Sequence, residues 1–113
     1  MTLPQIEAYA LTLLVEAVAA FLLGPRFGAD PRRAALAAII GSALSHPVFW
    51  PSAIALYPKL GGLTIPLLEA AVVFFESIAY RVLATKFWRI ALILSALVNF
   101  ASWLTGVLVF ALQ

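Results

Sequence analysis

The sequence predicts an all-α membrane protein with four transmembrane helices, arranged as two tandem helical hairpins in parallel repeat. Of its 113 residues, 65% are hydrophobic and only 11% are charged, and the mean hydropathy is +1.08. Soluble domains carry about 25% charged residues. A chain this short exposes too much of its surface to hide such an apolar excess from water. We therefore expect the lipid bilayer to surround it.

The first predicted span covers residues 4–23, which as a helix is about 30 Å long and matches the hydrocarbon core of a bilayer. No basic residue precedes this run, so we expect it to remain as a span and not to be cleaved as a signal peptide. Gly24 and Pro25 end it. Asp30 and Pro31 are typical of the start of the next helix, since aspartate caps free N–H groups and proline lacks one.

The second predicted span covers residues 33–57 and contains Pro47 and Pro51. Each proline removes a backbone hydrogen bond and clashes with the preceding turn. We therefore expect a kink or a short unwound piece between His46 and Trp50.

The third and fourth predicted spans cover residues 64–83 and 88–112. The connections are too short to hold a soluble domain, and they make neighbouring spans antiparallel. Residues 1–113 are thus predicted to form a single transmembrane domain.

Basic residues predict the orientation, because they concentrate in cytoplasmic loops. The first and third turns and their flanking helix ends hold six of the seven, namely Arg26, Arg32, Arg33, Arg81, Lys86 and Arg89. Lys59 alone marks the second turn. This distribution predicts N and C termini on the non-cytoplasmic side of the inner cell membrane.

An internal repeat is suggested by aligning residues 12–50 with residues 65–103, which gives ten identities in 39 positions. Glu16 then aligns with Glu69, and His46 aligns with Asn99. The predicted repeats cover residues 4–57 and 60–112. The alternative is two unrelated hairpins that share a membrane composition.

Polar residues within the spans are the candidate functional residues, because a charge at the bilayer centre is costly unless it faces a partner or a wet cavity. The predicted substrate- or ion-binding set is Glu16, Glu69, His46, Asn99, Ser42 and Ser95. Protonated glutamic acids that only donate hydrogen bonds across the bundle are the alternative.

Small and polar residues at helical spacing predict packing seams, which would bring the second and fourth spans together at the centre. The seam residues are Ser95, Asn99, Ser102, Gly106, Gly41 and Ser45. A further interpretation concerns Glu76, which we expect to form an ion pair with Arg81 or Arg89. The alternative is a second carboxylate on a path inward from Glu69.

Several functional classes are disfavoured. Without cysteine the chain has no disulfide or thiolate site, and a single histidine disfavours a metal site, so we expect no metal and no cofactor. No phosphate-binding loop or nucleophile elbow is present, and no catalytic residue is assigned. The sparse basic residues do not form a nucleic-acid surface.

Three functions are compatible with these patterns. The first is a small transporter or permeation module for an ion or small molecule, working as a homo-oligomer. The second is an accessory or assembly subunit bound to a larger membrane-protein partner. The third, ranked last, is an intramembrane enzyme.

Overall fold

The computed structural model of the chain describes residues 3–112 and is all-helical, as predicted. Met1, Thr2 and Gln113, at the ends of the predicted domain, lie outside the described residues. Four helices are joined by short connections, two of which contain 3-10 turns. The elements are α1 Leu3–Leu23, η1 Gly24–Phe27, α2 Pro31–Leu60, η2 Gly61–Leu63, α3 Thr64–Leu83 and α4 Trp88–Ala111.

The helices are long and apolar enough to cross a membrane. Three continuous stretches meet this criterion, Pro4–Phe27, Pro31–Leu83 and Trp88–Val109. The second has 53 residues and folds back at η2, so it supplies both α2 and α3. Large apolar side chains such as Leu22, Ile54 and Val82 point outward. The chain is therefore a small multi-pass helical membrane protein.

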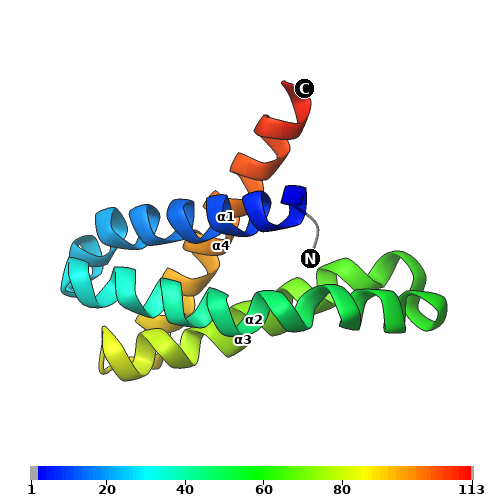
Figure 1. The fold of residues 1–113 in the computed structure, drawn as a ribbon. Coiled ribbons are helices and arrows are strands. Elements are labelled where there is room, and N and C mark those ends of the chain that lie inside the picture. The colour runs from blue at the N-terminus through cyan, green and yellow to red at the C-terminus, as the bar shows by residue number, and fades with distance from the viewer. Residues whose placement is uncertain (1–2, 113) are drawn as a thin grey trace.

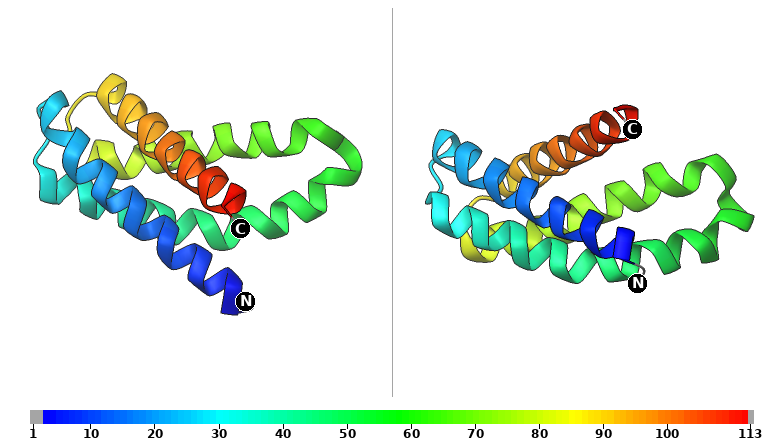
Figure 2. Two further views of the ribbon diagram at one scale, coloured as in Figure 1. Left: turned by 90° about the horizontal axis from the view of Figure 1, so that it is seen from above. Right: turned by 45° about the horizontal axis from the view of Figure 1, so that its top comes forward.

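Each helix packs against two others. α1 packs on α2 and α4, and α3 also packs on α2 and α4. The helices α2 and α4 consequently lie on a diagonal (Figure 2). Polar side chains of both helices hydrogen-bond to Glu76 of α3, Ser42 and Ser45 from α2 and Asn99 from α4. The direct seam between α2 and α4 stays a prediction.

The η1 turn and the link between α3 and α4 lie at the same end of the bundle (Figure 1). The η2 turn lies at the other end, towards which the start of α1 and the end of α4 also point. Six of the seven basic residues belong to the first end or to the helix ends beside it. Which end faces the cytoplasm remains a prediction from this charge distribution.

The start of α2 has the predicted cap. The carboxylate of Asp30 accepts hydrogen bonds from the backbone N–H groups of Arg32 and Arg33, at 2.9 and 3.1 Å. Pro31 occupies the first helical turn, where no N–H is needed. The preceding residues turn sharply because Gly28 has a φ of 80°.

The prolines of α2 do not unwind it. The helix continues through Pro47, Pro51 and Pro58, so the predicted unwound piece does not occur. The predicted kink does occur, as a bend near the middle of α2 (Figure 2). Pro47 cannot donate to the carbonyl of Ala43, four residues earlier. The hydroxyl of Tyr9 on α1 donates to that carbonyl at 3.2 Å. A side chain from the neighbouring helix therefore replaces the missing backbone donor.

Candidate functional site: buried carboxyl groups beside a central cavity

Two glutamates lie inside the bundle at facing positions. Glu16 on α1 is 2% exposed and Glu76 on α3 is 3% exposed. Burying a carboxyl group away from water is costly unless hydrogen bonds replace its hydration. The neighbouring helices supply such bonds, so the two acids form the centre of a buried polar network.

Donors from α2 and α4 surround Glu76. The hydroxyls of Ser42 and Ser45 both donate to Oε1 of Glu76, each at 3.0 Å. The side-chain amide of Asn99 donates to Oε2 at 2.8 Å. Ser42 also makes a hydrogen bond with Oε2 of Glu16, so one hydroxyl connects the two carboxyl groups.

Gly41 is the reason that α2 comes close enough to Glu76. A Cβ atom at Gly41 would lie 3.2 Å from Cγ of Glu76 and 3.3 Å from its Cβ. Both distances are tighter than ordinary van der Waals contact. The absence of a side chain at Gly41 therefore lets the next residue, Ser42, reach the carboxyl group.

The helix α4 supports the network from the other side. Ser95 donates to the carbonyl of Val73 on α3 at 2.7 Å and does not contact either acid. Asn99 donates to the carbonyl of Ser95, one turn earlier, at 2.8 Å. Asn99 is thus held by its own helix while it binds Glu76.

A central cavity of about 400 Å³ opens beside the buried acids. All four helices contribute to its wall, which consists of Thr12, Glu16, Ser45, His46, Phe49, Trp50, Glu69, Val72, Asn99, Ser102, Trp103, Gly106 and Val107. Four of the six residues predicted to bind substrate line it, namely Glu16, His46, Glu69 and Asn99. No lysine or arginine belongs to this wall within the part of the chain that the structure describes.

Glu69 and His46 are half-buried, whereas Glu16 and Glu76 are almost fully buried. The ring of His46 packs on the ring of Tyr9, with centroids 5.4 Å apart. The carboxyl group of Glu69 is close enough to those of Glu16 and Glu76 for like charges to repel one another. The cavity wall therefore holds one buried carboxyl group, Glu16, and one half-buried carboxyl group, Glu69, while Glu76 lies behind the wall.

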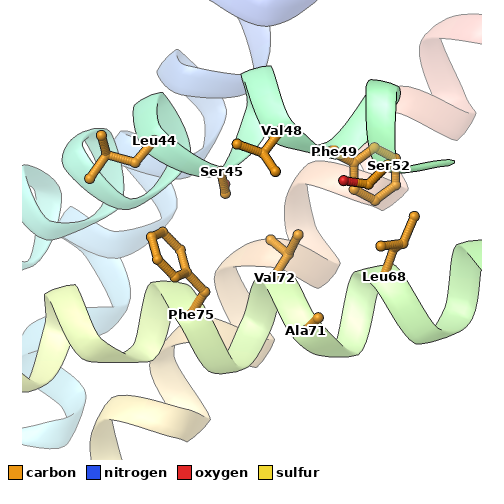
Figure 3. Close-up of a pocket in the computed structure, with 9 residues that line it drawn as sticks. All are labelled: Leu44, Ser45, Val48, Phe49, Ser52, Leu68, Ala71, Val72 and Phe75. Atoms are coloured by element: carbon orange, nitrogen blue, oxygen red, sulfur yellow. The ribbon is translucent and has the colours of Figure 1, made fainter. Parts of the chain in front are cut away.

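A second, apolar groove lies between α2 and α3 and has a volume of about 230 Å³ (Figure 3). Leu44, Val48 and Phe75 are among its lining residues. Ser45 and Val72 line both this groove and the central cavity. Only a thin layer of side chains therefore separates the polar cavity from the outer surface of the α2–α3 pair.

The predicted ion pair between Glu76 and Arg81 needs correction, because Glu76 turns towards Ser42, Ser45 and Asn99. Five residues along a helix rotate a side chain by about 140° from the starting face, which directs Arg81 away from Glu76. The guanidinium of Arg81 instead lies 5.6 Å from the centre of the Trp88 ring.

Glu76 is the site residue that the ungapped alignment missed. That alignment placed Glu16 opposite Glu69, two helical turns away from the acid that faces Glu16. Residues 15–19 read VEAVA and residues 75–79 read FESIA, and Arg26-Phe27 and Lys86-Phe87 follow at the same spacing. Allowing a longer first connection would have aligned Glu16 with Glu76.

The predicted seam residues have different surroundings. Gly41 and Ser45 contact Glu76, whereas Ser102 hydrogen-bonds Glu16. A Cβ atom at Gly106 would meet nothing within 4 Å. Gly106 therefore does not mark a close contact between helices within the described part of this chain.

Comparisons with known proteins add no name to this arrangement: no protein-family model, no curated protein and no solved structure matches the chain. Among residues 3–112, no group of three His, Cys, Asp or Glu side chains is placed to hold a metal ion. The central cavity and its acids are therefore the guide to function.

Proposed function

We propose that the protein is a small permeation module that carries protons or a small cation across the membrane through the central cavity. The observation that supports it most directly is the shared wall: Glu16, Glu69, His46 and Asn99 come from four different helices and line one cavity. Polar side chains that only pack helices together do not need to surround an open volume.

The charged residues that line the cavity favour a positively charged solute. Carboxyl groups from α1 and α3 reach the cavity, and no lysine or arginine among the described residues lines it. A cation in the cavity would face the carboxyl groups of Glu16 and Glu69. Trp50 and Trp103 also line it, and aromatic ring faces attract cations.

In this proposal Glu16 and Glu69 bind the proton or cation, while Ser42, His46, Ser95 and Asn99 serve the solute directly or hold the acids. Ser95 acts through Asn99, because the Asn99 amide also donates to the Ser95 hydroxyl, at 3.5 Å. Four helices enclose a small volume, so we propose that a homo-oligomer forms the complete pathway. The cytoplasmic end would be the one that carries the η1 turn.

Proton flux into liposomes tests the proposal. The purified protein would be reconstituted into liposomes that contain a pH-sensitive dye, and a potassium diffusion potential would drive protons inward. We expect the wild type to exceed protein-free liposomes, and Glu16→Gln and Glu69→Gln to fall to the protein-free rate. The same pair of variants would be tested for efflux of sodium from loaded liposomes.

Asp30→Asn is the matched control, because it makes the same change from carboxylate to amide at an exposed residue away from the cavities, and asparagine also caps helices. It should keep the wild-type flux. A wild type that moves neither protons nor sodium faster than protein-free liposomes would refute the proposal, and so would full flux in both cavity variants.

Gly106 is exposed although it also lines the central cavity. This exposed position favours a second candidate, an assembly subunit that docks a helix of a partner against α4. Because an added Cβ meets nothing there, Gly106→Leu should leave the isolated chain folded. Loss of a co-purifying membrane protein in this variant would support docking. Retention of every partner by Gly106→Leu would count against it.

A further inference from the structure

Hydrogen-bond donors are too few for both buried acids to be ionised. The hydroxyl of Ser42 contacts Oε2 of Glu16 and Oε1 of Glu76. A serine hydroxyl carries one hydrogen, so it donates to one of these oxygens only. The other contact is a hydrogen bond only if that carboxyl group is protonated and donates to Ser42.

The surroundings decide which acid is protonated. Glu76 has further donors, Ser45 on Oε1 and Asn99 on Oε2. An ionised carboxylate accepts hydrogen bonds on both oxygens, and several donors favour the charged form. For Glu16 the only other donor among the described residues is the hydroxyl of Ser102. The charge therefore belongs on Glu76.

We propose that Glu16 and Glu76 form a single proton-binding site in which Glu16 donates its proton to Ser42 and Ser42 donates to the Glu76 carboxylate. This assigns a binding role to Glu76 and makes Ser42 the bridge between the acids. Two like charges that share one hydroxyl would repel each other, and one proton removes that repulsion. The pair then gains or loses its proton as a unit.

The charged neighbours of this pair are consistent with a single negative charge. From α3, Glu69 and the buried Tyr80 have electrostatic contact with the acids. From α2, the titratable group on the cavity wall is His46, and the five residues that α4 contributes to this wall are all neutral. Without an adjacent basic side chain among the residues of this wall, a second negative charge in the pair would be uncompensated.

The repeat in the sequence also pairs Glu16 with Glu76. With the alignment that places Glu16 opposite Glu76, the buried Ala20 falls on the buried Tyr80. Residues of α2 match those of α4 at the original spacing, which places Ser42 opposite Ser95, both fully buried. The two acids would then be equivalent residues of two hairpins, and the shared proton makes them chemically different.

Infrared spectroscopy of the protein in lipid tests the assignment, because a protonated carboxyl group has a C=O stretch distinct from that of a carboxylate. At neutral pH, the wild-type spectrum minus that of Glu16→Gln should contain a band of one protonated carboxyl group. The same subtraction with Glu76→Gln should contain a carboxylate band and no protonated one. The reverse pattern, or no protonated band in the wild type, would overturn the proposal.

Ser42→Ala tests the bridge. Removing the hydroxyl takes away the acceptor of the Glu16 proton, so the C=O band of Glu16 should shift to higher frequency, as a less strongly hydrogen-bonded acid does. Ser52→Ala is the matched control on the same helix, since Ser52 lines the α2–α3 groove and not the central cavity. An unshifted band in Ser42→Ala would refute the bridge.

The shared proton rests on the proposed permeation function for its biological role. The two proposals can nevertheless be refuted separately. A protonated Glu16 in a protein that carries no proton or sodium flux would retain the pair and refute transport. Flux that depends on Glu16, with no protonated carboxyl group in the spectrum, would retain transport and refute the shared proton.

Discussion

The close approach of α2 to Glu76 leads to a prediction about Gly41. A Cβ atom there would lie 3.2 Å from Cγ of Glu76, so a larger side chain must push α2 away from α3. Overpacking costs about 1–3 kcal/mol, and hydrogen bonds between membrane helices contribute about 0.6 kcal/mol each. Two such bonds, from Ser42 and Ser45, depend on this contact. We expect Gly41→Leu to lower the free energy of unfolding by about 2–4 kcal/mol.

Reversible unfolding by SDS in mixed micelles, followed by circular dichroism, measures this change. Gly106→Leu is the control, because it makes the same substitution at a position where an added Cβ meets no described atom within 4 Å. The intrinsic helix preference of leucine over glycine contributes equally to both variants. If Gly41→Leu is no less stable than Gly106→Leu, the close contact between α2 and Glu76 is refuted.

Two further predictions concern hydrogen bonds between helices. Asn99→Ala removes the donor to Oε2 of Glu76. It should lower the free energy of unfolding by about 1–3 kcal/mol, which is the cost of leaving a buried polar group unpaired. Asn99→Gln should lose less stability, and equal losses of the two variants in SDS unfolding would contradict this prediction. Tyr9→Phe should cost about 0.6 kcal/mol in the wild type and less in a Pro47→Ala background, because the alanine backbone N–H would then donate to the carbonyl of Ala43. A double-mutant cycle with no coupling energy would show that the Tyr9 hydroxyl does not replace the missing donor.

The helices and turns were predictable because each depends on residues close together in the sequence. Apolar runs of bilayer length specified the spans, and Asp30 specified the start of α2 through its own neighbours. The continuity of α2 was not predictable in the same way. At Pro47, one of its three prolines, the free carbonyl is bound by Tyr9, which is 34 residues away in the sequence.

The cavity was partly predictable. Intramembrane polar residues must find a partner or water, which placed Glu16, His46 and Asn99 among the candidates, and they do line one cavity. The pairing of Glu16 with Glu76 could not be read from residue type alone. It depends on the register of α3 against α1, and a shift of two helical turns leaves the same face of α3 directed inward.

Stability and function are coupled in this bundle because the same side chains serve both. Lipid is as apolar as the outer residues, so burying apolar surface drives membrane helices together only weakly, and packing and interhelical hydrogen bonds must hold them. Here those bonds converge on Glu76. A buried ionised carboxylate is an expensive way to join helices, because a charged group loses more hydration on burial than a neutral one. The carboxylate is therefore better explained by proton binding. Glu76→Gln keeps one acceptor oxygen for Ser42 and Ser45 but turns an amide N–H group towards the Asn99 donor. We expect this variant to lose part of its stability in SDS unfolding and all of its flux in liposomes.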